Sequence, residues 1–262
     1  MPEPSSSAPL RYPDLLRMDG KVAVVLGAGQ GIGAEASCAL AQAGAMVVCV
    51  DREADRAAEV AQSVQGVACV ADCLHRDGMA GVFKAAVERF GGVDAVVDVI
   101  GVATPGPLGS LDDEAWAAQY DIVVRHAWLA LQLGSRAMRG REGSFAFVGS
   151  LAGVRVMPDL AAYGSAKAAL HHLVAAAAVE YGARGIRVNA VLPGYVRTPR
   201  LLSQFSSSRW AAIGRSVPLG RPCEPSEIAS VLLFLSSALA RYVTGHLLVA
   251  DGGAAVMAPP VG

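Results

Sequence analysis

The sequence has no long uninterrupted run of hydrophobic residues. Hydrophobic residues make up 53% of the 262 residues, but they are spread over many short segments. No segment reaches the roughly 20 consecutive apolar residues that a membrane-spanning helix needs. Residues 1–17 are polar and rich in Pro and Ser, without the charged and then apolar order of a secretion signal. We therefore expect no membrane partner and a cytoplasmic location.

Cysteine and charge are both scarce. The five cysteines are odd in number and lack paired spacing, which favours reduced core thiols over a disulfide framework. Lys and Arg are dispersed and the formal net charge is -1, so nothing indicates a surface for nucleic acid. The adjacent His171 and His172 point about 100° apart on a helix, so they cannot bind one ion from the same face. No metal site is apparent.

Seven short apolar segments, separated by alanine-rich helical stretches, indicate the fold class. Because these segments are continuously apolar, both faces of each strand should be buried, as in a parallel sheet covered by helices on both sides. The sequence therefore predicts an α/β fold with a doubly wound, Rossmann-type, seven-stranded parallel sheet. The predicted strands are 22–26, 46–50, 67–70, 95–97, 144–148, 186–191 and 247–249.

The chain length suits one α/β domain. We expect a flexible tail over residues 1–18, one domain over 19–255 and a second tail over 256–262. Residues 104–109 and 193–208 are rich in Pro, Gly and Ser and follow strands. They are therefore predicted to form loops above the carboxyl edge of the sheet, where ligands bind in such folds.

A glycine-rich turn follows the first predicted strand and precedes a helix over 34–43. Such a turn lets backbone N–H groups approach a pyrophosphate at the positive end of a helix. Its position between a strand and a helix favours dinucleotide binding over a purely structural turn. The predicted contacts here are Gly27, Gln30, Gly31, Ile32 and Gly33.

The ends of the second and third strands indicate which dinucleotide binds. Asp51 ends the second strand, where a carboxylate accepts hydrogen bonds from both ribose hydroxyls and repels a 2′-phosphate, which favours NAD. The alternative is a solvent-facing acid at a strand end. Arg52 is assigned to the same site, as are Asp72 and Cys73 after the third strand. Asp72 could meet the adenine amino group or simply cap its loop.

Catalytic residues are predicted near the fifth strand. Ser150 follows this strand. Tyr163 and Lys167 are four residues apart in the segment that opens the helical stretch over 168–181. On a helix this spacing places both side chains on one face. A lysine ammonium group beside the phenol would lower its pKa from about 10 and make it a usable acid or base. Ser150 could hold the substrate oxygen. An isolated Tyr/Lys pair would otherwise be a surface contact.

Together these motifs closely resemble the short-chain dehydrogenase/reductase family, from residue 20 to residue 253. The resemblance also rests on residues 187–194 with Thr198, and on residues 243–245 and 251–253. It implies that the nicotinamide side is lined by Pro193, Gly194, Val196 and Thr198. It further implies a homodimer or homotetramer built partly from the helices that contain residues 116–133 and 163–181.

The chain departs from the family pattern in three places. Leu26 stands where a Thr is usual, and Asp98-Val99-Ile100-Gly101 replaces Asn-Asn-Ala-Gly, although Gly101 still allows the backbone to approach the cofactor. Val123 stands where the family has an asparagine that holds a water molecule in a proton relay. His126, one helical turn later, could support a substitute path or be a satisfied structural histidine.

A substrate lid is predicted over residues 197–220. Its large apolar side chains suggest a small hydrophobic alcohol or ketone, alicyclic or steroid-derived, unless they only pack the lid onto the domain. The expected activity is NAD-dependent interconversion of a secondary alcohol and a ketone. An NADPH-dependent ketone reductase and a nucleotide-sensing protein without turnover are the alternatives. The predicted substrate contacts are Leu151, Leu201, Leu202 and Phe205.

Overall fold

The computed structural model describes residues 10–138 and 140–257 and confirms the predicted fold class. Within these residues seven parallel strands form one sheet in the order β3-β2-β1-β4-β5-β6-β7. The chain leaves β1 toward one edge of the sheet and returns at β4 to build the other half, so β1 and β4 flank the switch point of a doubly wound fold. The strands are β1 Val22–Leu26, β2 Met46–Asp51, β3 Val67–Val70, β4 Ala95–Asp98, β5 Gly143–Val148, β6 Ile186–Pro193 and β7 Leu247–Ala250.

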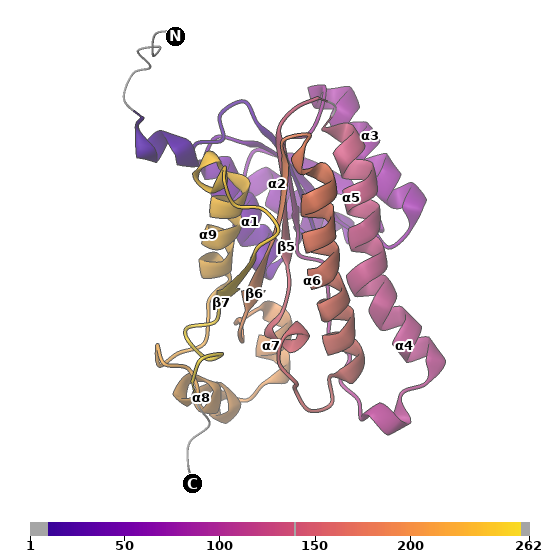
Figure 1. Ribbon diagram of the computed structural model, residues 1–262, viewed down its shortest axis with the longest axis vertical. Coiled ribbons are helices and arrows are strands. Elements are labelled where there is room, and N and C mark those ends of the chain that lie inside the picture. Colours follow the sequence, from indigo (N-terminus) through magenta and orange to yellow (C-terminus); the bar gives the residue numbers. More distant parts are fainter. Residues whose placement is uncertain (1–9, 139, 258–262) are drawn as a thin grey trace.

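Helices cover both faces of the sheet (Figure 1). On one face lie α1 Gly31–Gln42, α2 Ala54–Ser63 and α9 Pro225–Ser236, and on the other lie α3 Arg76–Phe90, α5 His126–Ala137 and α6 Ala161–Gly182. The remaining helices are α4 Asp113–Tyr120, α7 Pro199–Gln204 and α8 Ser207–Arg215, with short helical turns η1 Tyr12–Leu16, η2 Leu108–Ser110, η4 Leu151–Gly153 and η5 Ala238–Ala240. A π-helical turn, η3 Asp121–Arg125, joins α4 to α5. No helix among the described residues is long and apolar enough to cross a membrane.

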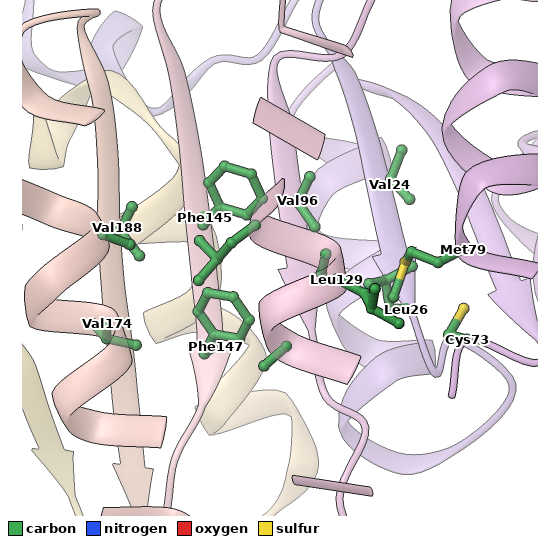
Figure 2. Packing of buried hydrophobic residues seen from close by; sticks show 14 of the residues in the cluster. Val24, Leu26, Cys73, Met79, Val96, Leu129, Phe145, Phe147, Val174 and Val188 are labelled. Atoms are coloured by element: carbon green, nitrogen blue, oxygen red, sulfur yellow. The ribbon is translucent and has the colours of Figure 1, made fainter. Parts of the chain in front are cut away.

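Two hydrophobic cores explain why the strands are continuously apolar. Along β1, Val24 and Leu26 point into the core beneath α3, α5 and α6, whereas Ala23 and Val25 point into the core beneath α1 and α9. Figure 2 shows the first core, where Phe145 and the other labelled side chains fill the space between sheet and helices. Both faces of the central strands β1 and β4 are removed from water, so alternation with polar residues is absent there. The prediction of burial on both faces is wrong for the edge strand β3, which exposes Val70 because it is the last strand at its edge of the sheet in the described part of the chain.

The N-terminal segment departs from the predicted flexible tail. Residues Tyr12–Leu16 form η1, which packs against η5, and the Met18 side chain is buried. The contacts of η1 with η5 and the buried Met18 therefore anchor this segment, although no side chain of η1 itself is buried. Residues 1–9, 139 and 258–262 lie outside the described part of the chain.

Candidate active site

A cavity of about 670 Å³ opens at the carboxyl edge of the sheet, across the switch point between β1 and β4. The structure brings together residues that lie up to 176 positions apart in the sequence, from Gly27 to Ser203. Most of the predicted cofactor and catalytic residues line this one cavity. They are Gly27, Gln30, Gly31, Ile32, Asp51, Arg52, Asp72, Cys73, Gly101, Ser150, Tyr163, Pro193, Gly194, Val196 and Thr198.

The glycine-rich turn places the start of α1 against the cavity. A Cβ atom at Gly33 would lie 2.0 Å from the carbonyl oxygen of Gly27, so only glycine lets the helix approach the strand this closely. Gly33 itself does not line the cavity and acts through this packing. The Gly33 and Ala34 amides donate to the Gln30 carbonyl at 3.2 and 3.5 Å, and the positive end of α1 suits a negatively charged group.

Asp51, the last residue of β2, is held by the backbone around it. Its Oδ2 accepts a hydrogen bond from the Gly29 amide at 2.9 Å, and its Oδ1 accepts one from the Glu53 amide at 3.0 Å. These contacts fix the carboxylate, while each oxygen keeps a second lone pair for a hydroxyl group. Arg56 and Arg200 line the same cavity. Neither arginine was predicted from the sequence as a cofactor contact.

The loop after β3 has a mixed role. The Asp72 Oδ1 accepts a hydrogen bond from the Leu74 amide at 2.9 Å, so this residue caps its loop as well as lining the cavity. Cys73 is buried, and burial, aided by Asp98, raises the pKa of its thiol to about 12. The thiol is therefore protonated and unreactive near neutral pH.

Tyr163 and Lys167 lie in the first two turns of α6, because this helix begins at Ala161, earlier than predicted. The Lys167 Nζ is 5.7 Å from the centre of the Tyr163 ring and donates a hydrogen bond to the Val148 carbonyl at 2.8 Å. A Cβ atom at Gly101 would lie 3.0 Å from the same Nζ. The glycine thus leaves the space in which the ammonium group sits.

Burial dominates the electrostatics of this pair. It raises the pKa of Tyr163, and a hydrogen bond with Ser150 acts in the opposite direction. It also lowers the pKa of Lys167 to about 8, while the nearby Asp98 carboxylate acts to raise it. The predicted lowering of the phenol pKa by Lys167 is thus outweighed by burial within the protein itself, because a desolvated phenolate is costly.

Ser150 is positioned from two sides. Its Oγ accepts a hydrogen bond from the Ala152 amide at 3.1 Å, which caps η4 and leaves the hydroxyl proton free to be donated. Its own amide lies 3.4 Å from Nε2 of the buried His171. Burial, followed by the nearby Lys167, lowers the pKa of His171 to about 4. A neutral imidazole can accept the amide proton.

Asp98 and Val123, two of the departures from the family pattern, lie close to this site. Asp98 ends β4, and its Oδ1 is 3.1 Å from Nε2 of His126 in the buried interior. Val123 lies within the π-helical turn η3 and is fully buried. His126 is therefore held by Asp98 through Nε2, while its Nδ1 has no partner among the described residues, so the two predicted alternatives for this histidine both stay open.

The end of β6 leads directly into the lid. The Thr198 Oγ1 accepts a hydrogen bond from the Leu201 amide at 3.4 Å and so caps α7, while its own proton remains available to the cavity. The backbone of Val196 pairs with Cys223 in an isolated bridge that ties the start of the lid to the segment before α9. These contacts fix the wall of the cavity.

The four predicted substrate residues do not line the cavity within the described residues. Leu151 is buried in the hydrophobic core, since η4 turns its side chain inward. Phe205 packs against Tyr195 and Trp210, and Leu202 is exposed. Phe205 therefore packs within the predicted lid segment, and the contacts of this segment with substrate stay a prediction.

Other apolar residues take their place at the cavity wall. The sequence could not single these residues out as cavity residues, because each belongs to a segment whose other apolar residues build the core. Ser203 adds a polar group from the lid. The apolar residues are Val99, Ile100, Val102, Ile122 and Val148.

Comparisons with known proteins agree with this geometry. The model of a family described as enoyl-(acyl carrier protein) reductase matches residues 27–255. Galactitol 2-dehydrogenase (L-tagatose-forming) of Cereibacter sphaeroides is 37% identical over 92% of this chain and 98% of its own length. Cis-4-hydroxycyclohexanecarboxylate dehydrogenase of Sinomonas cyclohexanicum is 36% identical over 89% of this chain and 96% of its own.

Solved structures extend the likeness to three dimensions. A 7 alpha-hydroxysteroid dehydrogenase complexed with NADH and 7-oxo glycochenodeoxycholic acid has a TM-score of 0.90 and 32% identity, covering 93% of this chain and 98% of its own. A short-chain type dehydrogenase/reductase from Mycobacterium marinum has a TM-score of 0.88 and 31% identity, covering 93% and 99%.

Proposed function

The chain belongs to the short-chain dehydrogenase/reductase family of oxidoreductases, which act on CH–OH groups with a nicotinamide cofactor, and we propose that it is an NAD-dependent dehydrogenase of a hydrophobic secondary alcohol. The observation that carries the proposal is the shared cavity: Ser150 and Tyr163 line it together with Asp51 and the glycine-rich turn. Lys167 contacts the Tyr163 ring from within the wall.

In the proposed reaction each side chain handles one part of the proton and hydride transfer. Tyr163 takes the proton of the substrate hydroxyl, and Ser150 donates a hydrogen bond to the substrate oxygen and orients it. The Lys167 Nζ lies 5.7 Å from the centre of the phenol ring, and its positive charge stabilises the Tyr163 phenolate that accepts this proton. Asp51 and the glycine-rich turn would hold the dinucleotide, whose oxidised nicotinamide would supply the acceptor for the hydride of the carbinol carbon, so that a ketone would remain.

Asp51 supports NAD as the cofactor. Its carboxylate is fixed by the Gly29 and Glu53 amides at the end of β2, where it can accept ribose hydroxyls. A 2′-phosphate would face this negative charge. The second candidate, an NADPH-dependent ketone reductase, is favoured by Arg52, Arg56 and Arg200 in the same cavity.

The apolar wall supports a hydrophobic, alicyclic or steroid-derived substrate. Relatives include a cis-4-hydroxycyclohexanecarboxylate dehydrogenase and a 7alpha-hydroxysteroid dehydrogenase, and the cavity that Ser150 and Tyr163 line has apolar residues in its wall. Residues 197–220, with α7 and α8, are proposed as the lid over this substrate. The galactitol relative makes a polyol the main competing substrate class.

We also propose that the chain assembles into a homodimer or homotetramer. Trp116 and Val179 expose apolar surface on α4 and α6, although neither is needed for the cavity. Light scattering coupled to size-exclusion chromatography measures the assembly, and a monomer at micromolar concentration would contradict it.

The test is a cofactor titration followed by an absorbance screen for reduced nicotinamide. Cyclohexanols, hydroxysteroids and galactitol are offered with NAD or NADP, beside a Tyr163→Phe variant that retains the ring and loses the hydroxyl. We expect turnover of cyclic alcohols with NAD, and a loss of kcat of roughly 1,000-fold or more in the variant. Saturable NAD binding without turnover of any alcohol would favour the sensing role, and a fully active Tyr163→Phe variant would refute the mechanism.

A further inference from the structure

A buried pair of ionisable side chains lies beside the active site. Asp98 is the last residue of β4 and His126 is the first residue of α5, and the Oδ1 and Nε2 atoms are 3.1 Å apart. Each side chain is only 1% exposed. Neither residue lines the cavity, so the pair acts on the reaction only through neighbouring groups.

The pair is incompletely satisfied. Oδ1 of Asp98 accepts the Ile100 amide at 3.0 Å in addition to His126. Oδ2 of Asp98 and Nδ1 of His126 have no hydrogen-bond partner among the described residues. Burying a carboxylate in this way is costly unless another charge compensates it, so a positive group should lie nearby.

The π-helical turn η3 brings His126 to the sheet. It adds a residue to one helical turn just before His126, and each added residue rotates the following helix by about 100°. Such turns are found often at functional sites. Here the turn aims the imidazole at the end of β4 while it buries Val123.

Lys167 is a positive group within electrostatic reach of Asp98, although no salt bridge joins the two among the described residues. Gly101 follows Asp98 by three residues, and a Cβ atom there would lie 3.0 Å from the Lys167 Nζ. The Asp98 charge works against the burial that lowers the pKa of Lys167 to about 8. The other titratable groups facing Asp98 are His126 from α5 and the protonated thiol of Cys73 after β3. The strands on either side present Leu26 and Phe147.

We propose that Asp98 and His126 are a positioning pair for Lys167: Asp98 supplies the buried negative charge opposite the ammonium group, and His126 holds that carboxylate by donating a hydrogen bond from Nε2. The histidine is then the neutral Nε2–H tautomer. The three groups together carry no net charge, which limits the cost of burying them. The catalytic consequence rests on the proposed function, whereas the electrostatic arrangement concerns the protein alone.

The sequence offers a direct readout, because it contains only three lysines, at positions 21, 84 and 167. With ¹³Cε-lysine labelling, NMR follows the titration of each ammonium group in the cofactor-free protein, and Lys21→Arg and Lys84→Arg variants assign the signals. We expect Asp98→Asn to lower the pKa of Lys167 by about one unit.

Variants of the histidine keep the test independent of one substitution. His126→Leu leaves the carboxylate without its side-chain donor, so its charge is lost or displaced and the pKa of Lys167 falls as in Asp98→Asn. His126→Gln retains an N–H donor and should keep the wild-type titration. If Asp98→Asn does not fold, this pair of variants still decides the matter.

Asp94→Asn is the matched control, since Asp94 directly precedes β4 at its opposite end and is also buried. It should leave the titration of Lys167 unchanged. The proposal is overturned if Asp98→Asn and His126→Leu both leave the pKa of Lys167 within about 0.3 units of the wild-type value, or if Asp94→Asn lowers it as much as Asp98→Asn does.

Kinetics then test the catalytic consequence. Alcohol oxidation needs a deprotonated Tyr163 and a protonated Lys167, so the rate should fall at high pH as the lysine loses its proton. In Asp98→Asn this descending limb should move to lower pH by about one unit. A wild-type protein without turnover would refute the proposed function and leave the NMR result standing, whereas an unmoved limb in active Asp98→Asn would refute the positioning role.

Discussion

A buried aspartate lies at each end of β4, and the two carboxylates differ in their partners. At the amino end, Asp94 accepts the Val22 amide at 2.9 Å and pairs with Lys21 at 3.3 Å and Arg141 at 3.6 Å. At the carboxyl end, Asp98 has no lysine or arginine within salt-bridge distance among the described residues, and one of its oxygens has no partner.

This difference separates a stabilising edge of the sheet from a functional one. Asp94 has a partner for each oxygen, and both of its cations reach solvent, so the charge there is inexpensive. The negative charge of Asp98, by contrast, depends on Lys167 for compensation and on His126 for a hydrogen bond. Incompletely satisfied buried groups are uncommon in proteins and concentrate where a function requires them. The carboxyl edge should therefore respond to substitution in activity, and the amino edge in stability.

The largest expected effect is from Ser150→Ala at the carboxyl edge. Loss of the hydroxyl that orients the substrate oxygen should reduce kcat/KM roughly 100-fold or more. The free energy of unfolding should fall by only about 1 kcal/mol, because the cap on the Ala152 amide is lost. Steady-state kinetics and urea unfolding measure the two quantities.

Ser144→Ala is the counterpart control near the amino end of β5. Its buried hydroxyl donates to the Ser236 carbonyl at 3.3 Å, far from the cavity wall. Its kcat/KM should equal that of wild type. If both serine variants lost activity equally, the distinction between the edges would fail.

The next effect concerns the cofactor. Asp51→Asn removes the negative charge at the end of β2 and leaves Arg52, Arg56 and Arg200 in place. Since a hydrogen bond to a charged group contributes about 1.5–3 kcal/mol, the ratio of kcat/KM for NADP to that for NAD should rise roughly 10- to 100-fold. Adding Arg56→Ala should reduce the gain with NADP. An unchanged ratio would mean that Asp51 does not contact the ribose.

Asp94→Asn tests the amino edge directly. Weakening the pairs with Lys21 and Arg141 should lower the free energy of unfolding by about 2 kcal/mol, since a largely buried carboxylate loses its charge-assisted partners. Its kcat/KM should stay within about twofold of wild type, because Lys21 and Arg141 do not line the cavity and their ion pairs with Asp94 act on stability alone. A loss of activity comparable to that of Asp98→Asn would remove the contrast between the two ends.

The smallest effect is an acid sensitivity of the carboxyl edge. The pKa of His171 is lowered from 6.5 to about 4, so below pH 6.5 the unfolded chain binds a proton that the folded protein does not. Stability should therefore be constant above pH 6.5 and fall as the pH drops toward 4, by about 1 kcal/mol at pH 5.5. Urea unfolding of wild type and His171→Gln between pH 7 and 4.5 should give a steeper decline for wild type, and parallel curves would contradict this origin.

Sequence reasoning succeeded where local pattern and fold rules coincide. The apolar segments located all seven strands, and the glycine-rich turn, Asp51, Ser150 and Tyr163 were assigned to the cavity they line. It did not predict that Phe205 packs on its neighbours or that Leu151 turns into the core. An apolar side chain has the same signature whether it faces a substrate or a core, so pattern cannot separate the two.

The sequence by itself determined the α/β fold, the position of the glycine-rich turn and the Tyr163/Lys167 spacing, because each depends on residues that are neighbours along the chain. Only the tertiary structure decided which residues from distant parts of the chain come together. It places Arg56 and Arg200 in the cavity that Asp51 lines, and it brings His126 to Asp98, whose charge acts on Lys167. These contacts arise from the packing of helices onto a sheet and from one π-helical turn. Their distances, burial and charge balance have no trace in local sequence.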